Sequence, residues 1–142
     1  MASAATVDDL EVRGQRVLLR VDFNVPMRDG AIVDDRRIRA ALPTITGLRE
    51  RGARVVVVTH LGRPKGRVND ALRVGPVAER LAALLRAPVA VAPGVVGADV
   101  EAAVSRLSDG DVLMLENVRF EPGEEQNDPA LAAQLARLGD LY

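Results

Sequence analysis

Three short segments carry the side chains best suited to chemistry, and each follows an apolar run that predicts a β-strand. They are residues 20–26 (RVDFNVP), 60–64 (HLGRP) and 116–120 (ENVRF). Together they offer carboxylate, amide, imidazole and guanidinium groups. In a parallel α/β sheet, the loops at the carboxyl ends of the strands share one rim, and ligands bind there. We therefore expect these segments to form one site for a small molecule that carries phosphate and carboxylate groups.

The first segment alternates polar and apolar side chains at the end of its strand. Asp22 and Asn24 flank Phe23, and alternate residues of an extended chain share a face. Asp22 and Asn24 should therefore point one way and Phe23 the other. A carboxylate beside an amide can bind a substrate hydroxyl. The alternative is a strand-end turn held by local side-chain hydrogen bonds.

The second segment combines an imidazole, a glycine and a guanidinium. Gly62 permits close backbone approach, and Arg63 offers a planar fork that matches phosphate oxygens. His60 is the only histidine of the chain, so a histidine pair or a histidine–metal cluster is excluded. The alternative for His60 is a polar residue that ends a strand without binding anything.

Four arginines lie next to the predicted rim: Arg20, Arg37, Arg63 and Arg119. A single arginine at any of these positions would normally be a solvated charge. Four together would repel one another. We expect either a bound anion or nearby carboxylates, namely Asp22 and Glu116, to offset them.

Several classes of function are not supported. No G-x-G-x-x-G or G-x-x-x-x-G-K-[ST] motif is present, so we predict no nucleotide site in this chain. No spacing typical of metal ligands is visible, so we also predict no metal site. The net charge of −1 gives no general attraction to nucleic acid or to anionic membranes. The absence of cysteine, of a secretory signal and of a long apolar run favours a cytoplasmic protein.

The rest of the chain alternates strand-like and helix-like segments. Strands are predicted over 17–21, 55–59, 89–91 and 112–115, and helices over 36–51, 76–86, 99–107 and from 128 onward. Pro43 is expected to start a second helical segment within 36–51. The alternation predicts an α/β fold, a parallel sheet with flanking helices in a Rossmann-like three-layer arrangement. Residues 141–142 resemble the start of a fifth strand, so we expect the sheet to be truncated before it is complete.

Taken together, the motifs resemble those of the phosphoglycerate kinase family. The matching segments are 20–26, 37–45, 60–64, 115–120 and 122–128, in the right order and spacing. The resemblance covers nearly the whole chain, and several long motifs in order are far more specific than any one of them.

The resemblance implies a two-lobed, monomeric, cytoplasmic enzyme that moves a phosphoryl group between 1,3-bisphosphoglycerate and Mg-ADP. Residues 1–142 would be a partial N-terminal domain that binds 3-phosphoglycerate or 1,3-bisphosphoglycerate. The C-terminal lobe that binds Mg-ADP or Mg-ATP would lie outside this chain. The chain itself is then expected to bind no cofactor, metal, nucleic acid or membrane.

The resemblance also implies roles for particular residues. The substrate-binding set is Asp22, Phe23, Asn24, Arg37, His60, Leu61, Gly62, Arg63 and Arg119. Asp22 and Asn24 would hold the hydroxyl and carboxyl end of the substrate, and His60, Arg63 and Arg119 its non-transferred phosphate. Arg37 would be catalytic, since phosphoryl transfer depends on positioning and charge stabilisation more than on covalent chemistry.

Three hypotheses follow for the chain itself. It is the N-terminal part of a phosphoglycerate kinase, inactive alone; or a stand-alone module that binds phosphoglycerate weakly; or a non-functional fragment. An incomplete sheet would expose a strand edge and apolar helix faces, which favour aggregation.

Overall fold

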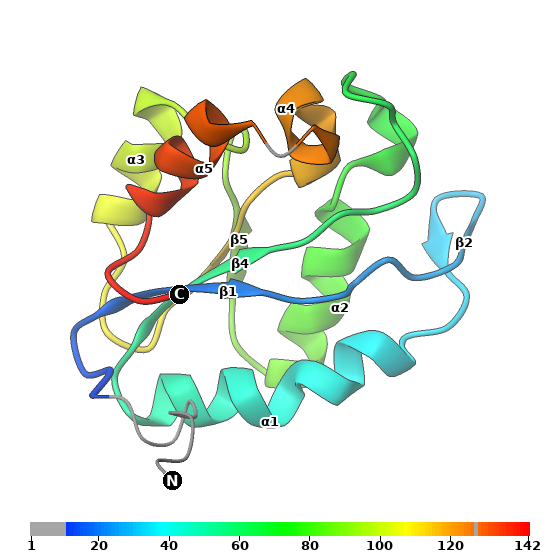
Figure 1. The fold of residues 1–142 in the computed structure, drawn as a ribbon. Helices are drawn as coiled ribbons and strands as arrows, with labels where there is room; N and C mark the ends of the chain where they lie inside the picture. The colour runs from blue at the N-terminus through cyan, green and yellow to red at the C-terminus, as the bar shows by residue number, and fades with distance from the viewer. Residues whose placement is uncertain (1–10, 127) are drawn as a thin grey trace, which may run out of the picture.

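A computed structural model describes residues 11–126 and 128–142. Its main sheet is parallel, with the strand order β1 (Arg16–Arg20), β4 (Arg54–Val58), β6 (Val112–Met114), β5 (Val89–Val91). Helices α1 (Arg36–Glu50) and α2 (Gly75–Leu85) cover one face, and α3 (Ala98–Ser105) and α5 (Pro129–Ala136) cover the other (Figure 1). The predicted α/β fold, a parallel sheet with flanking helices, is confirmed.

The continuous valine run in β4 explains why the sheet is buried on both faces. Val55 and Val57 pack into the core cluster that contains α1 and α2, whereas Val56 and Val58 pack into the cluster that contains α3 and α5. Each of these side chains is at most 2% exposed. Alternate residues of a strand point to opposite faces, so only an unbroken apolar run can supply both cores.

Helix α1 runs without a break through Pro43, and the predicted second helical start at this residue is wrong. Pro43 is exposed, and so is Arg39, whose carbonyl loses its usual helical partner. Water can therefore satisfy that carbonyl. Ile38, Ile45 and Leu48 pack in the core on both sides of the proline and hold the helix against the sheet.

A small hairpin follows the first rim loop and was not predicted. It consists of β2 (Met27–Arg28) and β3 (Ala31–Ile32), which pair antiparallel. The two residues between them, Asp29 and Gly30, have φ angles of 52° and 77°. An Asp-Gly pair with both φ angles positive is the signal of a tight hairpin turn, so the sequence did contain the information.

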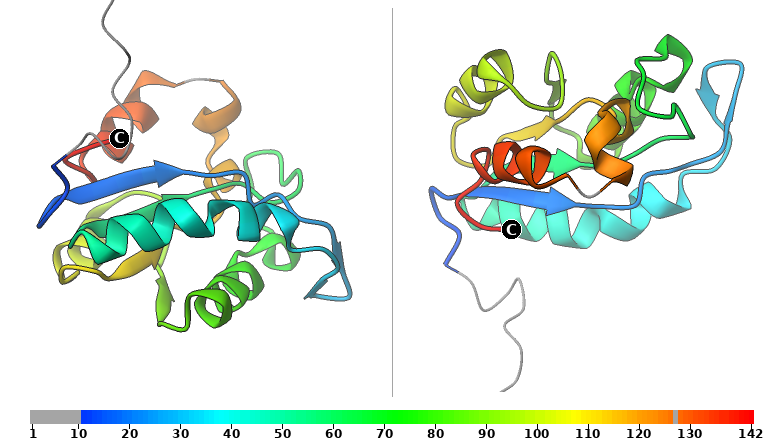
Figure 2. Two further views of the ribbon diagram at one scale, coloured as in Figure 1. Left: turned by 90° about the horizontal axis from the view of Figure 1, so that it is seen from below. Right: turned by 45° about the horizontal axis from the view of Figure 1, so that its top comes forward.

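Leu141 lies beside β1, on the edge opposite β4. It forms a parallel bridge with Val17, and the Leu18 N–H donates to the Leu141 carbonyl at 2.9 Å. The chain therefore returns to the sheet where a strand was predicted to begin. Figure 2 shows this return next to β1.

No helix among residues 11–126 and 128–142 combines the length and the apolar character needed to cross a membrane.

Candidate functional site

The three predicted loops leave the sheet at the same edge. The register pairs Arg20 with Val58 and Val57 with Met114, so β1, β4 and β6 end side by side. Backbone hydrogen bonds continue the contact beyond the strands, since the Val118 N–H donates to the Thr59 carbonyl at 3.1 Å. The expected common rim is therefore present.

Asp22, Asn24, Arg37 and Gly62 are brought together at this rim. Arg37 Nη1 donates to Asp22 Oδ1 at 3.2 Å and to the Asn24 carbonyl at 2.7 Å. The Gly62 N–H donates to Asn24 Oδ1 at 2.9 Å. The Asp22 and Arg37 side chains are 63% and 53% exposed, so both can reach a ligand from solvent.

Phe23 and Leu61 face the core instead. Their exposures are 0% and 1%. The Phe23 N–H donates to Thr59 Oγ1 at 3.0 Å, and the Leu61 N–H donates to Asn117 Oδ1 at 3.3 Å. Of the substrate-binding residues that we expected, Phe23 and Leu61 therefore anchor the loops to the core and do not present their side chains to a ligand.

The loop that carries Arg63 depends on the glycine before it. Gly62 has a φ of +65°, and a Cβ atom there would lie 2.6 Å from Leu72 Cδ2. Arg63 itself is exposed, and no hydrogen bond or ion pair of its side chain occurs among residues 11–126 and 128–142. Its guanidinium is therefore available to an anion.

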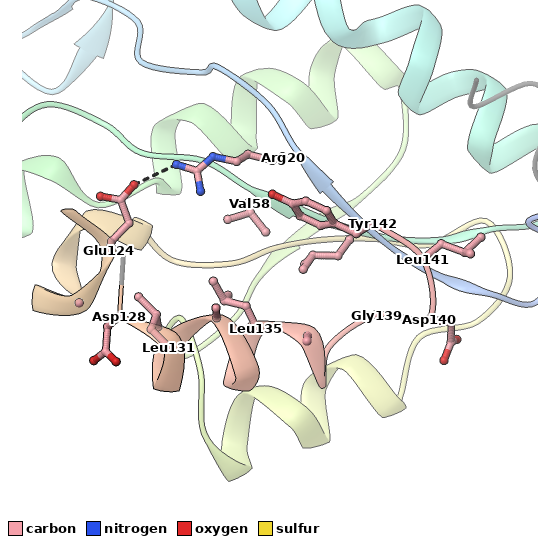
Figure 3. Close-up of a pocket in the computed structure, with 14 residues that line it drawn as sticks. Arg20, Val58, Glu124, Asp128, Leu131, Leu135, Gly139, Asp140, Leu141 and Tyr142 are labelled. Carbon is pink, nitrogen blue, oxygen red and sulfur yellow. Dashed lines mark hydrogen bonds and ion pairs between the residues drawn. The ribbon is translucent and has the colours of Figure 1, made fainter. Parts of the chain in front are cut away.

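Arg20 and Arg119 share one carboxylate, that of Glu124 in helix α4 (Pro122–Glu125). Arg20 Nη2 lies 2.9 Å from Glu124 Oε1, and Arg119 Nε lies 3.1 Å from Glu124 Oε2. The contact between Arg20 and Glu124 is drawn in Figure 3. Glu124 thus takes the charge-balancing role that we had predicted for Glu116.

Glu116 does not balance the rim arginines, because its carboxylate serves the start of helix α2. Glu116 Oε1 accepts from the Val74 N–H at 2.9 Å, and Oε2 lies 3.5 Å from Arg73 Nη1. A helix N-terminus attracts a carboxylate because its N–H groups and its dipole are positive there. Asp22, in contrast, pairs with Arg37 as expected.

His60 has a lowered pKa, and the causes place it beside the cationic cluster. Partial burial lowers its pKa most, and the positive charge of Arg119 lowers it further, while Glu124 and Asp22 oppose the effect. Arg20 adds a smaller lowering effect. His60 is therefore neutral near pH 7 and offers a hydrogen bond rather than a full charge.

Asn117 organises the rim and received no role from the sequence. It is fully buried. Its amide donates to the Leu61 carbonyl at 2.7 Å and to the Leu72 carbonyl at 3.0 Å, and its oxygen accepts from the N–H groups of Leu61 and Arg119. A polar residue within a buried run must be fully hydrogen-bonded, and that was the available signal.

Two cavities border the site. One of about 470 Å³ lies beside Asn24 and Arg37. A larger one of about 630 Å³ runs between β1 and α5 and is mostly lined by apolar side chains such as Leu131 and Leu135 (Figure 3). Among the residues that line this cavity, only Arg20 and Glu124 belong to the charged side chains of the rim. We therefore locate the site at the rim and not in this cavity. No group of acidic, histidine or cysteine side chains suited to a metal ion occurs in the described part of the chain.

The fold and the residues at the rim together define a class of protein. It is a parallel α/β domain whose strand-end loops bring together arginines, a histidine, an aspartate and an asparagine. A family profile described as Phosphoglycerate kinase matches residues 7–142. The chain belongs to the phosphoglycerate kinase family.

Individual relatives agree with this membership. The chain is 55% identical over 137 residues to a phosphoglycerate kinase of Moorella thermoacetica and 53% identical to one of Fervidobacterium nodosum. Each alignment covers 96% of this chain but only 35% and 34% of the relative. The chain therefore spans about a third of the length of these curated relatives.

Solved structures give the same result. The crystal structure of phosphoglycerate kinase from Pyrococcus horikoshii superposes with a TM-score of 0.82 at 36% identity, over 94% of this chain and 34% of that one. The structure of phosphoglycerate kinase from Coxiella burnetii gives a TM-score of 0.80 at 36% identity, over 94% of this chain and 32% of that one.

Proposed function

We propose that this chain supplies the phosphoglycerate-binding half of a phosphoglycerate kinase. The reaction is the reversible transfer of a phosphoryl group from 1,3-bisphosphoglycerate to ADP, which gives 3-phosphoglycerate and ATP. The observation that carries the proposal is the linked group Asp22, Asn24, Arg37 and Gly62, which joins the first helix to two rim loops through hydrogen bonds of 2.7 to 3.2 Å.

Within this proposal, each end of the substrate has its own partners. Asp22 and Asn24 hold the hydroxyl and carboxyl end, since one is an acceptor and the other can donate and accept. Arg63, Arg119 and His60 hold the phosphate that is not transferred. Neutral His60 donates a hydrogen bond there, and the arginines supply the positive charge.

Arg37 is the proposed catalytic residue. Its Nη1 contacts Asp22 and the Asn24 carbonyl, which supports a role for the guanidinium at the rim. There it can stabilise the charge on the transferring phosphoryl group, the main requirement of this reaction. Asp22 and the Asn24 carbonyl hold Arg37 in place before a ligand arrives, which lowers the cost of reorganisation.

The co-substrate in this proposal is Mg-ADP or Mg-ATP, held by a part of the protein outside these residues. The full enzyme is proposed to be monomeric and cytoplasmic, in keeping with the family's place in glycolysis. A separate binding module is not favoured, because the homologues are phosphoglycerate kinases of which this chain spans about a third.

The proposal is tested by titrating the chain with 3-phosphoglycerate in a calorimeter, with Arg63→Ala as the site variant. Arg63 has no ion pair to lose within the described residues, so the change removes a ligand contact without a structural one. Loss of one charge-assisted hydrogen bond weakens binding by roughly ten- to a hundredfold.

The matched control is Arg67→Ala. Arg67 is an exposed arginine of the same loop but lies outside the predicted motif. Its loss should change the affinity by less than about twofold, the effect of a surface charge. Equal effects of the two substitutions would contradict the proposed site, and so would equal affinity for glycerate without a phosphate.

A further inference from the structure

Glu124 is a nearly buried carboxylate between two guanidinium groups that come from distant parts of the chain. Its side chain is only 9% exposed. Arg20 is 104 residues away in sequence, at the end of β1, and Arg119 lies in the 3-10 helix η3 (Val118–Phe120). A carboxylate in such surroundings is stable only when it is paired and hydrogen-bonded, and here each carboxylate oxygen accepts from one arginine.

Glu124 is less exposed than the two arginines that it contacts. The Arg20 and Arg119 side chains are 44% and 28% exposed, against 9% for Glu124. The guanidinium groups are therefore more accessible than the carboxylate to an anion from solvent.

Helix α4, which carries Glu124, is held by close backbone contacts. A Cβ atom on Gly66 would lie 2.9 Å from Pro122 Cα, and the Gly66 N–H donates to the Arg119 carbonyl at 3.1 Å. On the other side, a Cβ on Gly123 would lie 2.7 Å from Asp128 Cβ. The carboxylate is thus presented from a fixed position, as a group that orients others must be.

We propose that Glu124 is a positioning residue for phosphate binding: it holds Arg20 and Arg119 side by side and orients the Arg119 guanidinium through Nε. The inference rests on the proposed function, because Arg119 is taken as a phosphate ligand. Without the carboxylate, the two like charges would repel each other at the rim and would lose their common acceptor.

Two explanations of the effect of Glu124 predict opposite changes in phosphate affinity when its carboxylate is replaced. By charge alone, removal of an anion near a phosphate site tightens phosphate binding. By positioning, it weakens binding, because the arginines lose their common acceptor. Two variants separate these effects: Glu124→Asp keeps the charge but cannot span both arginines, and Glu124→Gln keeps the shape but loses the charge.

The experiment is calorimetric titration of the chain with 3-phosphoglycerate for both variants, with far-UV circular dichroism to establish folding. We expect each variant to bind roughly tenfold more weakly, the factor for one charge-assisted hydrogen bond. The control is Asp140→Asn, which removes the carboxylate partner of Arg16 on the same strand. Its affinity should stay within about twofold of the native value.

A double-mutant cycle shows whether Glu124 acts through Arg119. In an Arg119→Ala background, Glu124→Asp should weaken binding far less than in the native chain, whereas a general loss of structure would give additive effects. Native or tighter binding by Glu124→Asp overturns the inference, as does additivity in the cycle. Failure of the native chain to bind 3-phosphoglycerate removes the proposed function itself; if Glu124→Gln does not fold, Glu124→Asp decides.

Discussion

Among the single residues of the rim, His60 has a pKa that reflects the charges around it. It is the only histidine of the chain, and it stands among Arg20, Arg119, Glu124 and Asp22, whose charges act on it in opposite directions. Burial and Arg119 lower its pKa below the ordinary value near 6.5. A bound phosphate dianion would stabilise the charged imidazolium and raise the pKa again.

The His60 imidazole proton signal should therefore titrate below pH 6.5 in the free chain and at a higher pH with 3-phosphoglycerate. Since the chain has one histidine, proton NMR gives the curve without assignment. A free pKa at or above 6.5 would contradict the burial of His60. An unchanged pKa on saturation with the ligand would place the phosphate elsewhere.

The lowered pKa has a further consequence for stability. Above about pH 6.5, His60 is neutral in both folded and unfolded chains, so its full contribution is present. As the pH falls through 6.5 toward the folded pKa, the unfolded chain takes up the proton first, and the folded state loses stability. Replacement by glutamine should remove this part of the pH dependence in urea unfolding.

Among the elements, the loops at the rim owe their shape to a few buried polar groups and one glycine. Asn117 links the loop after β6 to the loop after β4 by hydrogen bonds of 2.7 to 3.3 Å. Thr59 ties the end of β4 to Phe23 after β1. The site is therefore formed by side-chain hydrogen bonds between loops, and the sheet fixes where these loops begin.

Gly62→Ala should destabilise the chain by about 1–3 kcal/mol, because alanine is strained at a positive φ and its Cβ would meet Leu72 at 2.6 Å. Gly47→Ala is the matched control: it lies within α1 with nothing within 4 Å of the added Cβ. There alanine should stabilise by up to about 1 kcal/mol. Urea unfolding measures both. Equal effects would mean that the Gly62 loop tolerates other conformations.

At the scale of the molecule, the chain spans about a third of the length of its curated relatives. Strand β1 lies at an edge of its main sheet. Asp140 and Leu141 form backbone hydrogen bonds with that strand edge, and Leu141 forms a parallel bridge with Val17. The apolar cavity of about 630 Å³ lies beside it. The proposed phosphoglycerate half-site thus lies within about a third of the length of these relatives.

We predict no turnover by this chain alone in an assay that couples ATP formation to a dye reaction. In the proposed function, the rim alone binds 3-phosphoglycerate, whereas phosphoryl transfer requires both substrates to be held in line. The assay should use the chain at a concentration where calorimetry detects 3-phosphoglycerate binding. Turnover above a control with the Arg37→Ala variant would overturn this prediction.

Much of the fold followed from sequence pattern because local rules were enough. The unbroken valine run in β4 required burial on both faces, and the alternation of strands and helices gave the parallel sheet. The positions of Asp22, Phe23 and Asn24 followed from strand periodicity alone. The course of α1 through Pro43 did not, because a break depends on whether water and core packing compensate for one lost hydrogen bond.

The sequence by itself determined which chemical groups stand at the rim, because strand ends fix the positions of residues close to them in the chain. Only the tertiary structure decided which carboxylate serves which cation. Glu116 is three residues from Arg119 yet binds the start of α2, while Glu124 reaches Arg20 across 104 residues. Ion pairing depends on the distance between two groups in space and on their burial, and the separation of two residues in the sequence reveals neither.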